Sequence, residues 1–218
     1  LIRGRAGGYT ACCIHKPIEI SSRSAWPAWF KVGLMNAPTS PEKQASMERA
    51  ARQAEVVAAL QQVVPQHALL WTPEDTTPYE CDGLTAYRER PLVVVLPETY
   101  AQVQGVLKAC HALQVPVVAR GAGTGLSGGA MPHKLGVTLS LAKFNQILNI
   151  DVAARTAVVQ CGVRNLAISE AVSQYGLYYA PDPSSQIACT IGGNVAENSG
   201  GVHCLKYGLT VHNVLKVK

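Results

Sequence analysis

The chain has 218 residues, of which 48% are hydrophobic and 15% are charged, so it has the composition of a globular protein and not of a disordered one. The formal net charge is +5, but five basic residues and one acidic residue before position 41 supply +4 of it and leave +1 for the rest. A nucleic-acid surface requires a basic stripe on the folded part. We therefore expect no nucleic-acid partner.

The cysteines bear on compartment and metal content. There are seven, and none forms a C-x-x-C pair. This argues against a disulfide framework and against a zinc or iron–sulfur site, so we predict no metal site and a cytoplasmic location. No apolar run reaches the length that a membrane-spanning helix needs, since the block from Leu92 to Leu96 ends at Pro97. No transmembrane segment is expected.

The N-terminal part divides into a leader and a helical segment. Residues 1–40 show no hydrophobic period and are interpreted as a disordered or misassigned leader, with an amphipathic membrane-surface segment as the alternative. A helix is predicted over 41–64, because Ser40 can cap it and Pro65 ends it. With the turn-rich stretch that follows, residues 41–90 form the second predicted division.

Residues 91–218 form the third division and have an α/β pattern. A buried strand at 92–96, a helix at 97–114 and a strand at 115–119 predict a right-handed crossover with parallel strands. Gly176 is placed as a left-handed residue that ends a helix. The remaining predicted elements are strands at 137–141, 146–151 and 156–160 and a helix at 164–175.

A glycine-rich loop follows the strand that ends at Ala119, with five glycines between positions 120 and 129. Such a density has a large entropic cost and suits a backbone that approaches a ligand closely, where successive N–H groups form an anion site. Thr124 and Ser127 add hydroxyl donors and Arg120 adds a positive charge. A pyrophosphate is the predicted ligand.

The spacing of Gly123, Gly125 and Gly128 also matches G-x-G-x-x-G. In a dinucleotide-binding Rossmann unit that motif opens a helix. Here the sequence leads through Met131, Pro132 and His133 toward a strand, so the Rossmann interpretation is rejected. A phosphate loop of the nucleotide hydrolases is rejected too, because no Gly-Lys-Ser/Thr follows.

A second glycine-rich stretch covers residues 189–201 and is interpreted as a loop with two Gly-Gly pairs, each close to an asparagine. Asparagine amides both donate and accept hydrogen bonds, which suits the edge of an isoalloxazine ring. A stiff turn at 180–185 lies between the two glycine-rich stretches. Each stretch alone is more often a simple turn, but the pair favours a site for a large ligand.

Three strings, TTPYECDGLTAYRERPLVVVLP, PVVARGAGTGLSGGA and YYAPDPSSQIACTIGGNVAENSGGVHCLKYGLTVHNVLK, resemble the FAD-linked oxidases of the vanillyl-alcohol oxidase type. Within that family they are most similar to the FAD-linked subunits of bacterial glycolate oxidases. The resemblance implies an α+β fold in which two subdomains hold FAD. It also implies that the fold is incomplete at the C-terminus.

The resemblance assigns cofactor-binding residues in two groups. The first group would bind the FAD pyrophosphate, and the second would line the flavin and the ribityl chain. Some relatives attach flavin through a histidine where this chain has Thr124, so non-covalent FAD is expected. The first group is Arg120, Gly121, Ala122, Gly123, Thr124, Gly125, Leu126, Ser127 and Gly128; the second is Pro181, Asp182, Ser185, Thr190, Gly192, Gly193, Asn194, Asn198, Gly200 and Gly201.

The resemblance further implies oxidation of a small 2-hydroxy acid, most simply glycolate to glyoxylate, with hydride transfer to the flavin and D-lactate as the alternative substrate. Electrons would leave through an iron–sulfur subunit, beside a second flavin-type subunit, in a complex that is cytoplasmic or peripheral on the inner membrane. No catalytic residue is assigned, and His203 is either close to the flavin edge or structural. A non-catalytic flavin-binding or assembly module, or an inert fragment, is the hypothesis of a different class.

Overall fold

The computed structural model describes residues 40–218, so all of the predicted leader except Ser40 lies outside the described residues. Residues 41–218 form one compact unit. The elements of this unit are α1 (Pro41–Leu60), η2 (Gln66–Ala68), β1 (Leu69–Leu70), α2 (Pro73–Thr76), η3 (Thr77–Tyr79), β2 (Val93–Val95), α3 (Tyr100–Ala112), β3 (Val117–Arg120), β4 (Val137–Ser140), β5 (Ile147–Asp151), β6 (Thr156–Val159), α4 (Asn165–Val172), η4 (Ser173–Tyr175), α5 (Ile191–Glu197), α6 (Cys204–Tyr207) and η5 (Thr210–Asn213).

A four-stranded mixed sheet has the strand order β1-β2-β4-β3. β1 is antiparallel to β2, whereas β2 and β3 are each parallel to β4. The two strands predicted on either side of α3 are therefore parallel, as expected, and β4 lies between them. All three residues of β2 are fully buried, which agrees with their continuous valine run.

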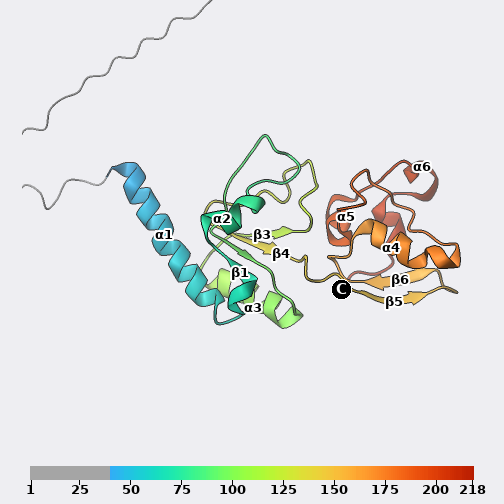
Figure 1. Ribbon diagram of the computed structural model, residues 1–218, viewed down its shortest axis with the longest axis horizontal. Coiled ribbons are helices and arrows are strands. Elements are labelled where there is room, and N and C mark those ends of the chain that lie inside the picture. The colour runs from blue at the N-terminus through green and yellow to red at the C-terminus, as the bar shows by residue number, and fades with distance from the viewer. Residues whose placement is uncertain (1–39) are drawn as a thin grey trace, which may run out of the picture. The chain divides into compact units, whose positions relative to one another are not determined.

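Helices α1 and α3 contact each other beside this sheet (Figure 1). Val56 and Leu60 from α1 and Val106 from α3 share one core with Val93 and Val95. The segment 41–90 therefore shares a core with the start of the segment 91–218. Within α3, the Thr99 hydroxyl accepts from the Gln102 backbone N–H and the Gln102 side chain accepts from the Thr99 backbone N–H, a reciprocal capping box that fixes the start of the helix.

The helix predicted over 41–64 ends four residues early, at Leu60. Turns occupy the positions just before Pro65, where the proline ring disfavours helical backbone.

A second sheet consists of β5 and β6, which pair antiparallel with an irregularity between Ile147 and Asn149. The turn between them is closed by the Asp151 carboxylate, which accepts from the Ala154 N–H at 2.8 Å. α4 lies alongside this hairpin (Figure 1). Gly176, which follows α4 and η4, has φ +67°, so the prediction of a left-handed residue there is confirmed.

The stretch 189–201 is not a loop throughout, as the sequence pattern suggested: residues Ile191–Glu197 form the helix α5. The sequence did not predict this helix, because its first turn contains two glycines and glycine has a low helix propensity. Tertiary contacts override that weakness, because the N–H groups of Ile191 and Gly192 donate to the carbonyls of Val163 and Cys161. Asn198 ends the helix in the left-handed region with φ 50°.

Candidate functional site

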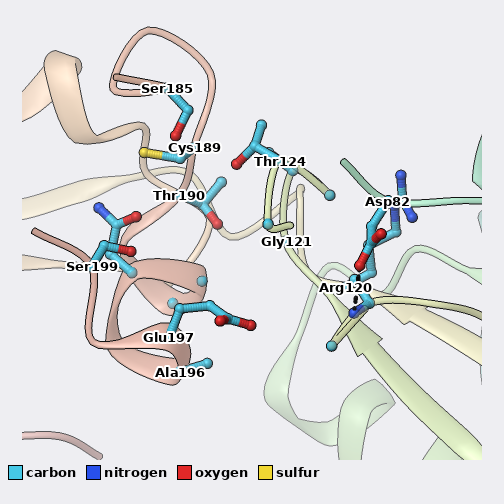
Figure 2. Close-up of a pocket in the computed structure, with 18 of the residues that line it drawn as sticks. Asp82, Arg120, Gly121, Thr124, Ser185, Cys189, Thr190, Ala196, Glu197 and Ser199 are labelled. Atoms are coloured by element: carbon cyan, nitrogen blue, oxygen red, sulfur yellow. Dashed lines mark hydrogen bonds between the residues drawn. The ribbon is translucent and has the colours of Figure 1, made fainter. Parts of the chain in front are cut away.

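A hollow of about 560 Å³ lies between the first glycine loop (residues 120–129) and the second glycine segment (residues 189–201). Its volume is in the range of small-molecule sites. Figure 2 shows Thr190 and Glu197 from the second segment on one side and Gly121 and Thr124 from the first loop on the other. The tertiary structure thus brings the two glycine-rich stretches to one place.

Most of the residues predicted to bind the cofactor line this hollow. Those that do are Arg120, Gly121, Ala122, Gly123, Thr124, Gly125, Leu126, Ser185, Thr190, Gly192, Gly193, Asn194, Asn198 and Gly200. Those that do not are Ser127, Gly128, Pro181, Asp182 and Gly201. Their contacts, described below, place them behind or beside the lining.

The hollow offers neutral hydrogen-bond donors. The backbone N–H groups of residues 122–127 donate to no other described residue, and the same holds for the N–H of Gly193. The Thr190 hydroxyl oxygen is buried and has no hydrogen-bond partner among the described residues. Because buried polar groups are normally paired, the Thr190 hydroxyl indicates a polar ligand, and the unpaired N–H groups of the first loop are available to it.

The glycines of the first loop make room mainly for other parts of the protein. A methyl group at Gly121 would lie 2.5 Å from the Thr190 hydroxyl, and one at Gly123 would overlap the Arg120 guanidinium. Gly123 and Gly128 also have φ values of +72° and +78°, which side chains disfavour. Close packing of the two walls, as well as ligand approach, therefore explains the glycine density.

Arg120 is buried under the loop and does not point into solvent. Its Nη1 donates to the Cys81 carbonyl at 2.8 Å, and its guanidinium lies 5.5 Å from the centre of the Tyr79 ring. The Arg120 guanidinium therefore supports the loop from the protein side. Its Nη1 group is already hydrogen-bonded to the Cys81 carbonyl before any phosphate binds.

The turn at Asp82 and Gly83 supports the same loop from the other end. The buried Asp82 carboxylate accepts from the Leu84 N–H at 2.9 Å and from the Ala130 N–H at 3.3 Å. A methyl group at Gly83 would lie 2.7 Å from the Gly125 carbonyl oxygen. Asp82 and Arg120 lie on the same side of the hollow in Figure 2. The sequence pattern assigned this turn no chemical role, because Asp82 and Ala130 are 48 residues apart in the sequence.

The two asparagines expected at the flavin edge have partners inside the protein. Asn194 Nδ2 donates to Asn165 Oδ1 at 2.8 Å, and Asn165 Nδ2 donates to the Pro181 carbonyl at 3.0 Å. Asn198 Oδ1 accepts from the Val211 N–H. These amides fix the positions of α5 and of the turn at Pro181, and their part in cofactor binding stays a prediction.

Asp182 is held by the segment that follows the second glycine pair. Its Oδ2 lies 2.6 Å from His203 Nδ1, and its Oδ1 accepts from the His203 N–H at 3.3 Å. Gly201 packs so closely against Asp182 that a methyl group there would overlap the Asp182 carbonyl. Burial raises the pKa of the Asp182 carboxyl, but the hydrogen bonds and charge of His203 outweigh it, and the pKa is lowered from 3.8.

His203 and His212, which follow the second glycine segment, both hydrogen-bond to other residues of the protein. His203 pairs with Asp182 and does not line the hollow. His212 Nδ1 accepts from the Leu209 N–H at 3.1 Å. Neither supplies a catalytic group to the hollow in the described part of the chain.

Several lining residues were missed by sequence reasoning. Asp82, Cys161 and Glu197 line the hollow, and each comes from a position without a motif of its own. Burial raises the pKa of the Cys161 thiol, with weaker opposing effects from backbone hydrogen bonds, so the thiol form is favoured over the thiolate. This disfavours the thiolate that a nucleophile requires, and a packing role for Cys161 stays a prediction.

These features fit FAD. The unpartnered Thr190 hydroxyl and the free N–H groups of the first loop suit the pyrophosphate, and the bare backbone at Gly193 suits a flat ring. Between residues 40 and 218, no group of three or more His, Cys, Asp or Glu side chains is arranged to hold a metal ion. In the same range, no helix is both long and apolar enough to cross a membrane.

Comparison with known proteins supports FAD as the cofactor. The family model described as "FAD binding domain" matches residues 91–218. The chain is 65% identical over 163 residues to the glycolate oxidase subunit GlcD of Escherichia coli strain K12, covering 75% of this chain and 33% of that protein. It is 36% identical over 157 residues to a D-lactate dehydrogenase of Anaerostipes hadrus, covering 72% and 33%.

A solved structure of alkyldihydroxyacetonephosphate synthase has a TM-score of 0.66 and 21% identity over 74% of this chain and 32% of that one, which shows the fold. The chain belongs to the FAD binding domain family, with the α+β fold of the vanillyl-alcohol oxidase type, and its cofactor is FAD. It spans about a third of the length of the curated relatives that it matches.

Proposed function

We propose that the chain is the FAD-binding part of a flavin-dependent 2-hydroxy-acid dehydrogenase that converts glycolate to glyoxylate. The observation that carries this proposal is the hollow between the two glycine-rich stretches, with its free backbone N–H groups and the unpartnered Thr190 hydroxyl. The similarity to GlcD supports glycolate as the substrate. FAD, when bound, accepts a hydride from the carbon that bears the substrate hydroxyl.

The residues of this chain bind and orient the cofactor. The N–H groups of residues 122–124 and the Thr190 hydroxyl would donate to the pyrophosphate. The N-terminal turn of α5 faces the flavin. Because Gly192 and Gly193 have no side chains, the flavin ring can approach the backbone there. This chain has Thr124 where some relatives of the resembled family attach flavin through a histidine, so the binding is non-covalent. No residue here is assigned as the catalytic base.

The remaining proposals concern context. The divisions are 1–40 as a leader, 41–90 as a helical and turn-rich segment and 91–218 as the FAD-binding domain. An iron–sulfur subunit accepts the electrons, beside a second flavin-type subunit, in a complex that is cytoplasmic or peripheral on the inner membrane. The similarity to a D-lactate dehydrogenase favours D-lactate as the alternative substrate.

The first experiment is the visible absorption spectrum of the purified chain, with released cofactor identified by chromatography. We expect a flavin spectrum and FAD. A colourless soluble chain would contradict a working site in this part of the protein. For the substrate, a chain extended to the length of its relatives should reduce an artificial acceptor faster with glycolate than with D-lactate; the reverse order selects the alternative.

The non-covalent binding mode has a separate test. Acid precipitation should leave all of the flavin in the supernatant. Flavin that stays with the pellet after washing would show a covalent link and would contradict the role given to Thr124.

A further inference from the structure

The side chains of Ser127 and Glu197 join the two walls of the site. The Ser127 hydroxyl donates to Glu197 Oε2 at 2.7 Å, across 70 residues of sequence. Within residues 40–218, this is the one hydrogen bond that connects residues 121–130 to residues 186–200. Glu197 is the last residue of α5, so the bond ties that helix to the far half of the first glycine loop.

The loop is shaped to admit this carboxylate. A methyl group at Gly129 would lie 2.8 Å from Glu197 Oε1, and one at Gly125 would lie 3.8 Å from the same atom. Two of the loop's glycines therefore lie under an acidic side chain. The sequence pattern had assigned all of them to the approach of a phosphate.

The chemistry of the pair decides what it can do for a cofactor. A serine hydroxyl has one proton, and here that proton is directed to Glu197, so Ser127 does not donate to a phosphate at the same time. A carboxylate accepts hydrogen bonds only and repels a phosphate. The pyrophosphate therefore belongs at residues 121–124 beside Thr190, away from this pair.

We propose that Glu197 is a positioning residue for FAD: it holds Ser127, and through it residues 125–129, against α5, which keeps the two walls of the hollow at the spacing that retains the cofactor. This inference rests on the proposed function, since it concerns retention of FAD by the same hollow. Both side chains are exposed, so their bond is not part of the core, and it acts on the cofactor by holding the two walls together.

The test is the rate at which the 218-residue chain releases FAD, measured by the recovery of flavin fluorescence after dilution. Glu197→Ala should release FAD roughly three- to tenfold faster, the size expected for the loss of one hydrogen bond of typical strength. Glu197→Gln should release it at nearly the wild-type rate, because the amide oxygen still accepts from Ser127.

Two further variants act on the same contact from the other wall. Ser127→Ala should match Glu197→Ala, and the double variant should be no faster than either, because both changes remove one bond. Gly129→Ala should also speed release by displacing the carboxylate.

Glu170→Ala is the matched control, because Glu170 is an exposed glutamate on α4. The melting temperatures of the flavin-free variants should lie close to that of the wild type.

The outcomes separate the two proposals. A wild-type chain that binds no FAD contradicts the proposed function. A wild-type chain that binds FAD, with an unchanged release rate in Glu197→Ala, contradicts the positioning role alone. Tighter binding by Glu197→Ala and Glu197→Gln alike would also overturn it, because repulsion of the phosphate would then be the main effect of the carboxylate. Additive effects of Ser127→Ala and Glu197→Ala would show that the bond is not the cause.

Discussion

Asn194 on α5 donates a hydrogen bond from its side-chain amide to the amide oxygen of Asn165 on α4, at a distance of 2.8 Å. Both side chains are almost completely buried, with exposures of 2% and 1%. Asn165 passes the connection on to the Pro181 carbonyl. The helix that carries Gly193 and the turn that carries Asp182 are thus fixed to a common support.

Asn165→Ala should lower the free energy of unfolding by about 1–3 kcal/mol, because it leaves the Asn194 amide and the Pro181 carbonyl unpaired in the interior. Urea unfolding of the flavin-free chain measures this. Asn149→Ala, at an exposed position of β5, is the control and should change little. A loss no larger than that of the control would show that water replaces the amide.

Replacement of Gly193 separates folding from cofactor binding. In the protein itself, a methyl group at Gly193 would lie 3.5 Å from the Thr190 hydroxyl, an ordinary contact, so Gly193→Ala should fold as well as the wild type. If the flavin lies against this backbone, Gly193→Ala should weaken FAD binding and Gly193→Val should abolish it. Equilibrium titration with FAD gives the affinity, and circular dichroism checks the fold.

Gly192→Ala is the contrasting change. Its methyl group would lie 2.9 Å from the Cys161 Cβ and 3.1 Å from the Cys161 carbonyl oxygen, so it should reduce stability in the absence of flavin.

For the Gly193 series, full flavin binding by purified Gly193→Val would show that the second glycine segment is wrongly placed against the ring.

The Asp82 carboxylate should be needed for the shape of the first glycine loop. Asp82→Ala removes the acceptor for the Leu84 and Ala130 N–H groups and should lower both the unfolding free energy, by about 1–3 kcal/mol, and the affinity for FAD. Asp82→Asn keeps one acceptor oxygen, so its unfolding free energy and FAD affinity should lie between those of the wild type and Asp82→Ala. Asp75→Ala, an exposed aspartate on α2, should leave FAD affinity unaltered. Equal FAD affinity in wild type and Asp82→Ala would exclude the supporting role.

The pair of Asp182 and His203 predicts a dependence of stability on acid pH. Burial raises the pKa of Asp182, but the hydrogen bonds and the charge of His203 together outweigh it, so the pKa lies below 3.8 in the folded state. The unfolded state therefore binds the proton more readily, so this carboxylate stabilises the fold above pH 3.8 and the contribution is lost as pH falls through the folded pKa.

His203→Ala should consequently raise the pKa of Asp182 and flatten the acid limb of the stability curve. Carboxyl chemical shifts followed through an acid titration report the pKa directly. His111→Ala, which removes an exposed histidine from α3, should leave the Asp182 titration as it is. An identical Asp182 pKa in wild type and His203→Ala would rule out the pair as its cause.

The sequence by itself determined the main strands and helices between residues 92 and 175, and it assigned the first glycine loop a ligand role that stays a prediction. The valine run at 93–95 predicted a buried strand, and the glycine density after Ala119 predicted a ligand loop without a following helix, because these signals depend on neighbours a few residues apart. The resemblance carried by the three strings identified the family. The position of Gly176 in the left-handed region followed from helix-ending rules alone.

Only the tertiary structure decided how the walls are joined. The helix α5 forms through bonds to Val163 and Cys161, which local propensity does not report. The contacts of Asp82 with Ala130 and of Glu197 with Ser127 bridge 48 and 70 residues, so no spacing rule within a motif could predict them. Pairings over such distances depend on how the sheets and helices pack, and that packing places two carboxylates beside a loop that the sequence alone had assigned to phosphate.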